Sequence, residues 1–220
     1  MNAKTRFEVK QKTVHNAPQL LKGMVNSLPA NNHPRYEGHE IPTTEQGRQG
    51  NFVTLGLDFK NAPTPTRKYA ADTCDVIERK GDLLLIFGQE SVFQFELDSV
   101  LQIRLNKVAA EGFLNLLDSP WNSATQQENW SEMLLNLNLQ KEELTPVSNK
   151  PPQQAKIAAN YAGVAISGTD TCIDFYYSSA FAMQQFSQTK KMFAEPMVRV
   201  DLHTALFVSF VDKMRLLLAK

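Results

Sequence analysis

The stretch VIERKGDLLLIF, residues 76–87, decides the fold because the chain carries a second version of it. Residues 164–175, VAISGTDTCIDF, align with it at an offset of 88 positions (164 − 76). Further on, LNKVA at 105–109 aligns with LHTAL at 202–206 at an offset of 97 (202 − 105), so the second version holds 9 more residues between the blocks (97 − 88). A period this long predicts two copies of one domain rather than a solenoid of short repeats.

Each copy reads as a strand, a tight turn, a second strand, a further strand and an apolar helix. Gly81 and Asp82 give the first turn the chemistry of a hairpin. Gly168 and Asp170 occupy the turn of the second copy. Aspartate is favoured in turns because its side chain can bond its own backbone, so we interpret Asp82 and Asp170 as structural residues.

The helix of each copy has a recognisable start. Asn106 is expected to cap the first, because its side-chain oxygen can accept from an unpaired amide of the first turn. His203 or Thr204 is expected to cap the second, which has a broad apolar face. A face of that width must be covered by a sheet or by a partner.

The sequence therefore predicts an α+β protein with two related antiparallel sheets, each followed by a packing helix, in a pseudo-twofold arrangement. Residues 1–145 are expected to hold an N-terminal extension that joins the first sheet, the first copy, and a connector helix near 128–143. The extension includes a predicted loop from 26 to 50, rich in Asn, Pro, Gly and His. Residues 146–155 form the predicted linker and 156–220 the second copy.

The second copy resembles a small prokaryotic domain family of unknown function. The resemblance is carried by NYAGVAIS at 160–167, by Ile173-Asp174-Phe175, and by EPMVRV at 195–200, which leads into the final helix. The chain departs from the family pattern in lacking a proline just inside that helix and in its insertion. The order of strands and helix also has a looser likeness to export chaperones of the SecB type, which is topological.

Composition is that of an ordinary globular protein of 220 residues, with 42% hydrophobic residues. Lys plus Arg and Asp plus Glu number 23 each, so no overall field steers the chain to nucleic acid or a membrane. No apolar run reaches the roughly 18 residues of a membrane span, and no secretory signal is recognisable. Cys74 and Cys172 occupy non-equivalent positions and are expected to be reduced thiols. These features predict a soluble, cytoplasmic protein.

The sequence motifs that could indicate a catalytic, cofactor-binding or metal-binding site are weak. Residues 163–170 look superficially like a phosphate loop, but Thr169 stands where lysine is required, and the segment lies in a hairpin. The loop HPRYEGHE at 33–40 gathers two imidazoles and two carboxylates in a spacing that matches no tight zinc motif. His203 is better placed to cap a helix than to act as a general base. We therefore expect no catalytic, cofactor-binding or metal-binding residues.

A nucleic-acid interface is the main alternative to a protein-binding surface. Aromatic side chains on a sheet can stack with bases, and neighbouring basic residues can contact phosphates. Consecutive tyrosines point to opposite faces, however, so at most one of them can join any platform. The residues concerned are Phe93, Phe95, Tyr176 and Tyr177, with the basic pairs Arg79-Lys80 and Lys190-Lys191.

Three hypotheses for function follow. The first is a non-catalytic interaction protein, such as an assembly component, adaptor or chaperone-like binder, that uses exposed sheet edges or the segments 26–50 and 178–189. Its expected partner is another protein, and a homo-oligomer is possible. The second is a nucleic-acid-associated module that uses the basic turns. The third is a metal enzyme that uses the 33–40 loop, for which purified protein would hold stoichiometric zinc.

Overall fold

The described part of the chain combines β-sheets with α-helices, and a C-terminal helix follows its last strand. This confirms the α+β class and the closing helix predicted from the sequence. The structure is a computed structural model, and it describes residues 2–8, 38–49, 52–58, 61–90, 97–118, 134–144, 153–189 and 191–219.

The first sheet is built on a three-stranded antiparallel meander: β6 (Thr73–Arg79), β7 (Asp82–Glu90) and β8 (Leu97–Asn106). Lys80 and Gly81 connect β6 to β7 with φ angles of 56° and 80°. These left-handed angles suit a two-residue hairpin turn, whose twist matches that of the strands. The hairpin expected over 79–82 is confirmed, with Arg79 opposite Asp82.

The second sheet contains a corresponding meander: β10 (Tyr161–Ser167), β11 (Asp170–Tyr177) and β12 (Met192–His203). Ser167 lies opposite Asp170 across its hairpin turn, and Gly168 in that turn has a φ of 60°. The short strand β2 (His39–Ile41) pairs with the start of β12 and extends the sheet there.

Two further strands make both sheets mixed. β5 (Lys68–Ala71) runs parallel to β12 in the second sheet, and β9 (Gln153–Ala159) runs parallel to β8 in the first. The prediction of purely antiparallel sheets was therefore wrong at these two edges. β5 precedes the β6–β7 hairpin of the first sheet but pairs with β12 of the second sheet. β9 precedes the β10–β11 hairpin of the second sheet but pairs with β8 of the first sheet. Both pairings are parallel.

Because of these crossings, each sheet combines strands from both of the predicted domains. The region predicted as the first copy gives β5 to the second sheet, and the region predicted as the second copy gives β9 to the first. The predicted linker, 146–155, overlaps β9 from Gln153 onward. Its preceding residues, 146–152, lie outside the described ranges.

Two helices close the core, and they start differently. α2 (Lys107–Leu117) follows β8, and the side chain of Asn106 accepts a hydrogen bond from the Ala109 amide at 2.8 Å, which confirms the predicted cap. α5 (Thr204–Leu218) follows β12, but His203 at its N-cap makes no capping bond. The Thr204 hydroxyl donates instead to the Gly168 carbonyl at 2.9 Å. The predicted side-chain cap of α5 was therefore wrong, because both side chains have partners elsewhere.

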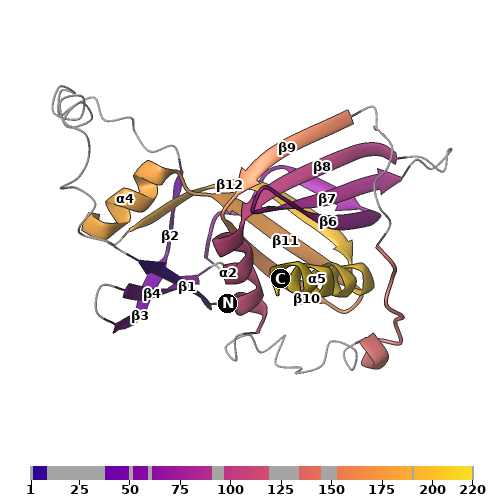
Figure 1. The fold of residues 1–220 in the computed structure, drawn as a ribbon, viewed down its shortest axis with the longest axis horizontal. Helices are drawn as coiled ribbons and strands as arrows, with labels where there is room; N and C mark the ends of the chain where they lie inside the picture. Colours follow the sequence, from indigo (N-terminus) through magenta and orange to yellow (C-terminus); the bar gives the residue numbers. More distant parts are fainter. Residues whose placement is uncertain are drawn as a thin grey trace.

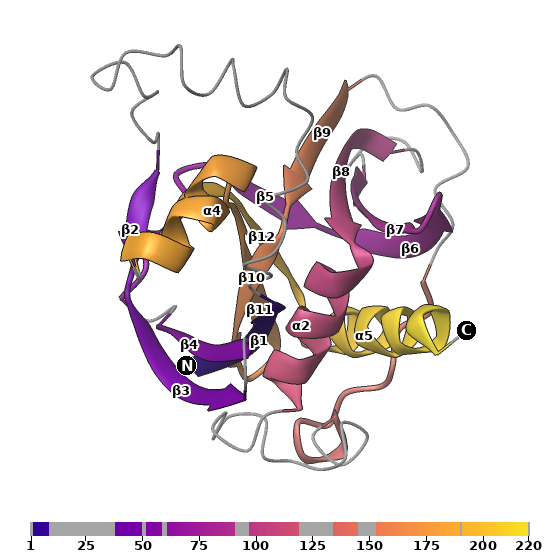
Figure 2. The same cartoon turned by 60° about the vertical axis from the view of Figure 1, so that its left-hand side comes forward.

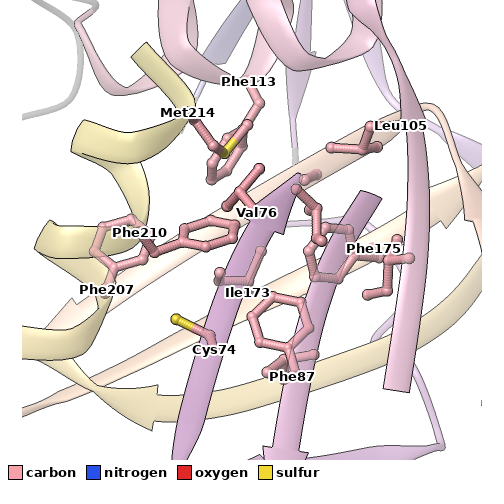
Figure 3. Packing of buried hydrophobic residues seen from close by; sticks show 14 of the residues in the cluster. Cys74, Val76, Phe87, Leu105, Phe113, Ile173, Phe175, Phe207, Phe210 and Met214 are labelled. Carbon is pink, nitrogen blue, oxygen red and sulfur yellow. The ribbon is translucent and has the colours of Figure 1, made fainter. Parts of the chain in front are cut away.

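One apolar core joins both sheets and both helices. Phe87 of β7 lies with its ring centroid 6.2 Å from that of Phe175 in β11 and 5.5 Å from that of Phe210 in α5. All three side chains are buried. Figure 3 shows these rings with Met214 and Phe113, which come from α5 and α2, around the same space. The two sheets therefore do not have separate hydrophobic cores.

The helices also cross between the sheets. α2 contacts β7 and β8, which precede it, and it contacts β10 of the second sheet as well. α5 contacts β11 and β12 and also β6 of the first sheet. Figure 1 shows α2 near the middle of the molecule and α5 beneath β6 and β7.

The connector helix predicted near 128–143 ends earlier than expected. Residues 134–136 are helical, and Asn138 then takes a left-handed φ of 54°. The Leu139 amide donates to the Leu134 carbonyl at 2.8 Å and the Asn138 amide to the Leu135 carbonyl at 2.9 Å. This pair of bonds is a Schellman motif, which ends a helix. Leu134 then packs on Ala205 and Val208 of α5.

The N-terminal extension forms a sheet of its own instead of joining the first sheet as predicted. β1 (Asn2–Glu8) and β3 (Thr43–Gln49) both pair antiparallel with β4 (Phe52–Asp58). The predicted loop 26–50 was also wrong in part, since it contains β2 and β3. These strands are polar or short, so their sequence lacks the apolar alternation that marks a half-buried strand. Residues 26–37 lie outside the described ranges.

Candidate functional site

A helix that interrupts the second meander is the strongest candidate for a functional surface. α4 (Ala180–Thr189) lies between β11 and β12 and packs against β12. Figure 2 shows it beside β2, away from α5. Ala182 and Phe186 are buried, and their spacing of four residues places them on one side of the helix. That side anchors α4 to the body of the protein.

A second apolar cluster forms the seat of α4. It brings the helix together with α2, β2, β10, β11 and β12, and its buried members are Ile41, Leu116, Tyr161, Tyr176, Phe186, Met192 and Ala194. Burial raises the pKa values of Tyr161 and Tyr176, so both phenols stay neutral. This seat is apolar and uncharged. Because one side of α4 packs on it, the other side of the helix faces solvent.

Apolar side chains are exposed on and beside α4 as well. Phe181 and Met183 of the helix are 63% and 37% exposed, and Tyr177 at the end of β11 is 37% exposed. The sequence of α4, AFAMQQFSQT, contains no charged residue. A surface helix normally presents charged or polar side chains on its outer side. An exposed phenylalanine and methionine on an uncharged helix are typical of a surface that another apolar surface covers.

The outer face of the second sheet carries a shallow depression of about 450 Å³. Its lining residues are Ala165, Ser167, Asp170, Thr171, Cys172, Asp201 and Leu202. Burial raises the pKa of the Cys172 thiol, which is therefore a poor nucleophile at neutral pH. None of the described residues that line this depression is a histidine or a lysine that could act as a base.

A charged pair lies on the same face, two ladder rows farther from the hairpin turn than Cys172. The Arg199 guanidinium donates two hydrogen bonds of 2.7 Å to the two carboxylate oxygens of Asp174. This bidentate contact raises the pKa of Arg199. The side chains are 25% and 16% exposed, respectively. Since each charge already has its partner, we interpret the pair as a cross-strand brace.

The candidate metal loop at 33–40 is described only at its end. His39 and Glu40 lie in β2, and the Glu40 carboxylate accepts a hydrogen bond of 3.0 Å from the Lys191 ammonium group. Residues 33–37 lie outside the described ranges. Within the described ranges, no group of three or more His, Cys, Asp and Glu side chains is placed to hold a metal ion.

The candidate nucleic-acid residues do not gather in the described part of the chain. Tyr176 is buried beneath α4, whereas Tyr177 is partly exposed. Arg79 and Lys80 are exposed at the β6–β7 turn, in the first sheet. Phe93, Phe95 and Lys190 lie outside the described ranges. The buried phenol of Tyr176 has no open face on which a base could stack.

His203 contacts a carboxylate instead of serving as a cap. Its Nδ1 atom lies 2.8 Å from a carboxylate oxygen of Glu142, in the segment that follows the turn at 134–136. The His203 side chain is 40% exposed and the Glu142 side chain is 43% exposed. The contact helps hold residues 134–144 along α5, together with the ion pair between Lys141 and Asp212.

Sequence reasoning placed an insertion and an interaction surface at 178–189 but missed the helix within it. The signal was weak because Gln184, Gln185, Ser187 and Gln188 dilute the apolar pattern of α4. The available signal was the pair Ala182 and Phe186, which repeats at helical spacing.

None of the helices in the described ranges combines the length and apolar character that a membrane crossing requires. Comparison of the chain with protein-family models, with curated proteins and with solved structures gave no significant match. The resemblance of the second copy to a small prokaryotic domain family therefore stays a prediction.

Proposed function

We propose that this chain is a non-catalytic protein-binding protein whose binding surface is the exposed side of α4. The observation that carries the proposal is Phe181, which is 63% exposed on a helix without charged residues. Burial of a phenylalanine side chain contributes about 1.5–3 kcal/mol, so leaving it in water is costly unless a partner covers it.

The exposed apolar side chains on and beside α4 indicate the kind of partner. Phe181 and Met183 lie on α4, and Tyr177 is the last residue of β11, just before the helix. Apolar side chains that project from a helix can dock into a hydrophobic groove of a second protein. Methionine adapts its shape to irregular apolar surfaces. We therefore propose a protein partner with an apolar, uncharged groove.

The proposed duplication identifies α4 as part of a segment that is present in one copy and missing from the other. We infer that β5-β6-β7-β8-α2 and β9-β10-β11-β12-α5 are two copies of one unit that exchange their first strands. Ala71 pairs with Leu202 of β12, and Ala159 pairs with Leu105 of β8. These partners correspond at offsets of 88 (159 − 71) and 97 (202 − 105), the offsets of the sequence repeat.

Hydrogen bonds support the same correspondence. Asp72 donates its amide to the Gly88 carbonyl and accepts from the Glu90 amide through its side chain. In the second copy, the Asn160 amide donates to the Tyr176 carbonyl, and the Asn160 side chain accepts from the Ser178 amide. These three residues lie 88 positions after Asp72, Gly88 and Glu90. The second copy differs by the segment that contains α4. A surface added to one copy, while the packing is kept, supports a binding role for it.

Replacement of Phe181 by serine tests the proposal. We expect the variant to lose at least about 90% of a stoichiometric partner recovered by affinity purification, since a central aromatic anchor is worth about 2 kcal/mol or more. Quantitative mass spectrometry of the recovered proteins measures the loss. Leu216→Ser is the matched control, because Leu216 of α5 is similarly exposed at 69%.

The control separates binding from general stickiness. Leu216→Ser should keep the partner at the level of the unaltered protein. Equal recovery with Phe181→Ser and with Leu216→Ser would contradict the proposal. Circular dichroism of both variants should match that of the unaltered protein, because exposed side chains contribute little to stability.

A further inference from the structure

The outer faces of the two meanders differ at corresponding positions beside their hairpin turns. Cross-strand partners share a face, so each ladder row presents its three side chains on one side of the sheet. The row two residues from the turn contains Ile77, Leu84 and Arg104 in the first sheet, and Ala165, Cys172 and Asp201 in the second. Large side chains thus stand where the other sheet has small ones.

The difference in size explains the depression in the second sheet. Ala165, Cys172 and Asp201 line it, together with Ser167 and Asp170 of the row at the turn. The first sheet has Arg79 opposite Asp82 in its corresponding row. Its face is raised at the positions where the second sheet is hollowed, and Ile77 is 39% exposed there.

The two faces also differ in charge. The charged residues that line the depression are two carboxylates, Asp170 and Asp201. The raised face has Arg79 and Arg104, and the Arg104 side chain is 67% exposed. Asp82 lies 3.8 Å from Arg104, so it offsets that charge in part while Arg79 remains exposed.

We propose that copies of this chain associate head to tail through these two faces. The raised face of one copy, defined by Ile77, Arg79 and Arg104, docks on the depression of the next copy. Ile77 enters the space above Ala165 and Cys172, and the arginines approach Asp170 and Asp201. Opposite charge and opposite shape both favour a second copy as the occupant, because a cationic projection and an acidic hollow of one molecule complement each other.

The geometry of such a contact has two consequences. The two patches are different surfaces, so the copy at each end of a head-to-tail chain keeps one free patch, and association continues beyond a dimer. The charges are exposed, so their attraction weakens strongly when salt shortens the screening length from about 10 Å at 0.1 M to about 3 Å at 1 M. The contact lies on the sheet faces and not on α4, so it is independent of the proposed partner surface.

Sedimentation equilibrium of the full chain at low salt tests the proposal. The weight-average mass should rise with concentration from 24.8 kDa to beyond twice that value, and should return toward 24.8 kDa in about 1 M NaCl. The double variants Arg79→Glu/Arg104→Glu and Asp170→Lys/Asp201→Lys should each associate at least about tenfold more weakly, since each places like charges against each other.

Mixing the two variants is the decisive step. One variant has two acidic faces and the other two basic faces, so an equimolar mixture should associate where each alone does not. The rescue also shows that both variants are folded. Lys107→Glu/Glu111→Lys on the exposed side of α2 is the control and should leave association unchanged. A monomer at every concentration, or a mixture that stays monomeric, would overturn the proposal.

Discussion

Replacement of Phe87 by alanine is expected to lower the free energy of unfolding by about 3–5 kcal/mol. The side chain is fully buried, and its ring contacts Phe175 of the second sheet and Phe210 of α5. Its removal leaves a cavity where the two sheets and a helix meet, and a close-packed core relaxes only partly around such a space. Urea unfolding followed by circular dichroism measures the change.

The form of the transition matters as much as its midpoint. Because both sheets share the core around Phe87, Phe87→Ala should unfold in a single step, with coincident transitions by circular dichroism and fluorescence. Phe87→Leu keeps most of the volume and should cost much less. A loss below about 1 kcal/mol, or separate transitions for the two sheets, would contradict a shared core.

The second large effect is expected at Lys213. Its ammonium group pairs with the carboxylate of Asp75, whose side chain is 7% exposed. After Lys213→Ala, the hydrogen bond from the Val76 amide, at 2.8 Å, is the contact that the Asp75 carboxylate keeps within the described part of the chain. A buried polar group that loses its partner costs about 1–3 kcal/mol. We expect destabilisation in that range by urea unfolding at neutral pH.

Lys141 provides the comparison for Lys213. It pairs with Asp212 of α5, and both side chains are more than a third exposed. Exposed ion pairs contribute about 0–1 kcal/mol, so Lys141→Ala should have a small effect. Adding Asp75→Asn to Lys213→Ala should recover part of the lost stability, because it removes the unpaired charge. If the two alanine variants were equally stable, Asp75 would not depend on Lys213.

The local elements of both meanders could be predicted from the sequence. Gly81 and Gly168 mark the hairpin turns, and Asn106 marks the start of α2. These features rest on interactions between near neighbours, such as a left-handed turn or a capped amide, which residue types determine directly. The antiparallel pairing of consecutive strands follows from the short turns between them.

The crossings could not be predicted in the same way. β5 and β9 are short, and nothing in KYAA or QQAKIAA specifies which sheet the strand will join. Their pairing is decided by the distant strands β12 and β8. A usable signal was present but missed, since Lys68-Tyr69-Ala70-Ala71 repeats as Lys156-Ile157-Ala158-Ala159 at the offset of 88 (156 − 68).

The position of the candidate site in the chain could be predicted from the sequence, but the residues that it exposes could not. The extra segment at 178–189 followed from the two alignment offsets. Which of its apolar residues face solvent depends on the seat of α4, where Ile41 and Met192 meet through the pairing of β2 with β12. That pairing joins residues 151 positions apart (192 − 41), a separation at which local sequence carries no information.

Nuclear Overhauser effects between backbone protons test directly whether the two proposed copies exchange their first strands. With exchange, we expect contacts between Ala71 and Leu202 and between Ala159 and Leu105. Without exchange, each strand would stay with its own copy. Contacts of Ala71 with Leu105 and of Ala159 with Leu202 would then replace them, and that result would contradict the exchange of strands.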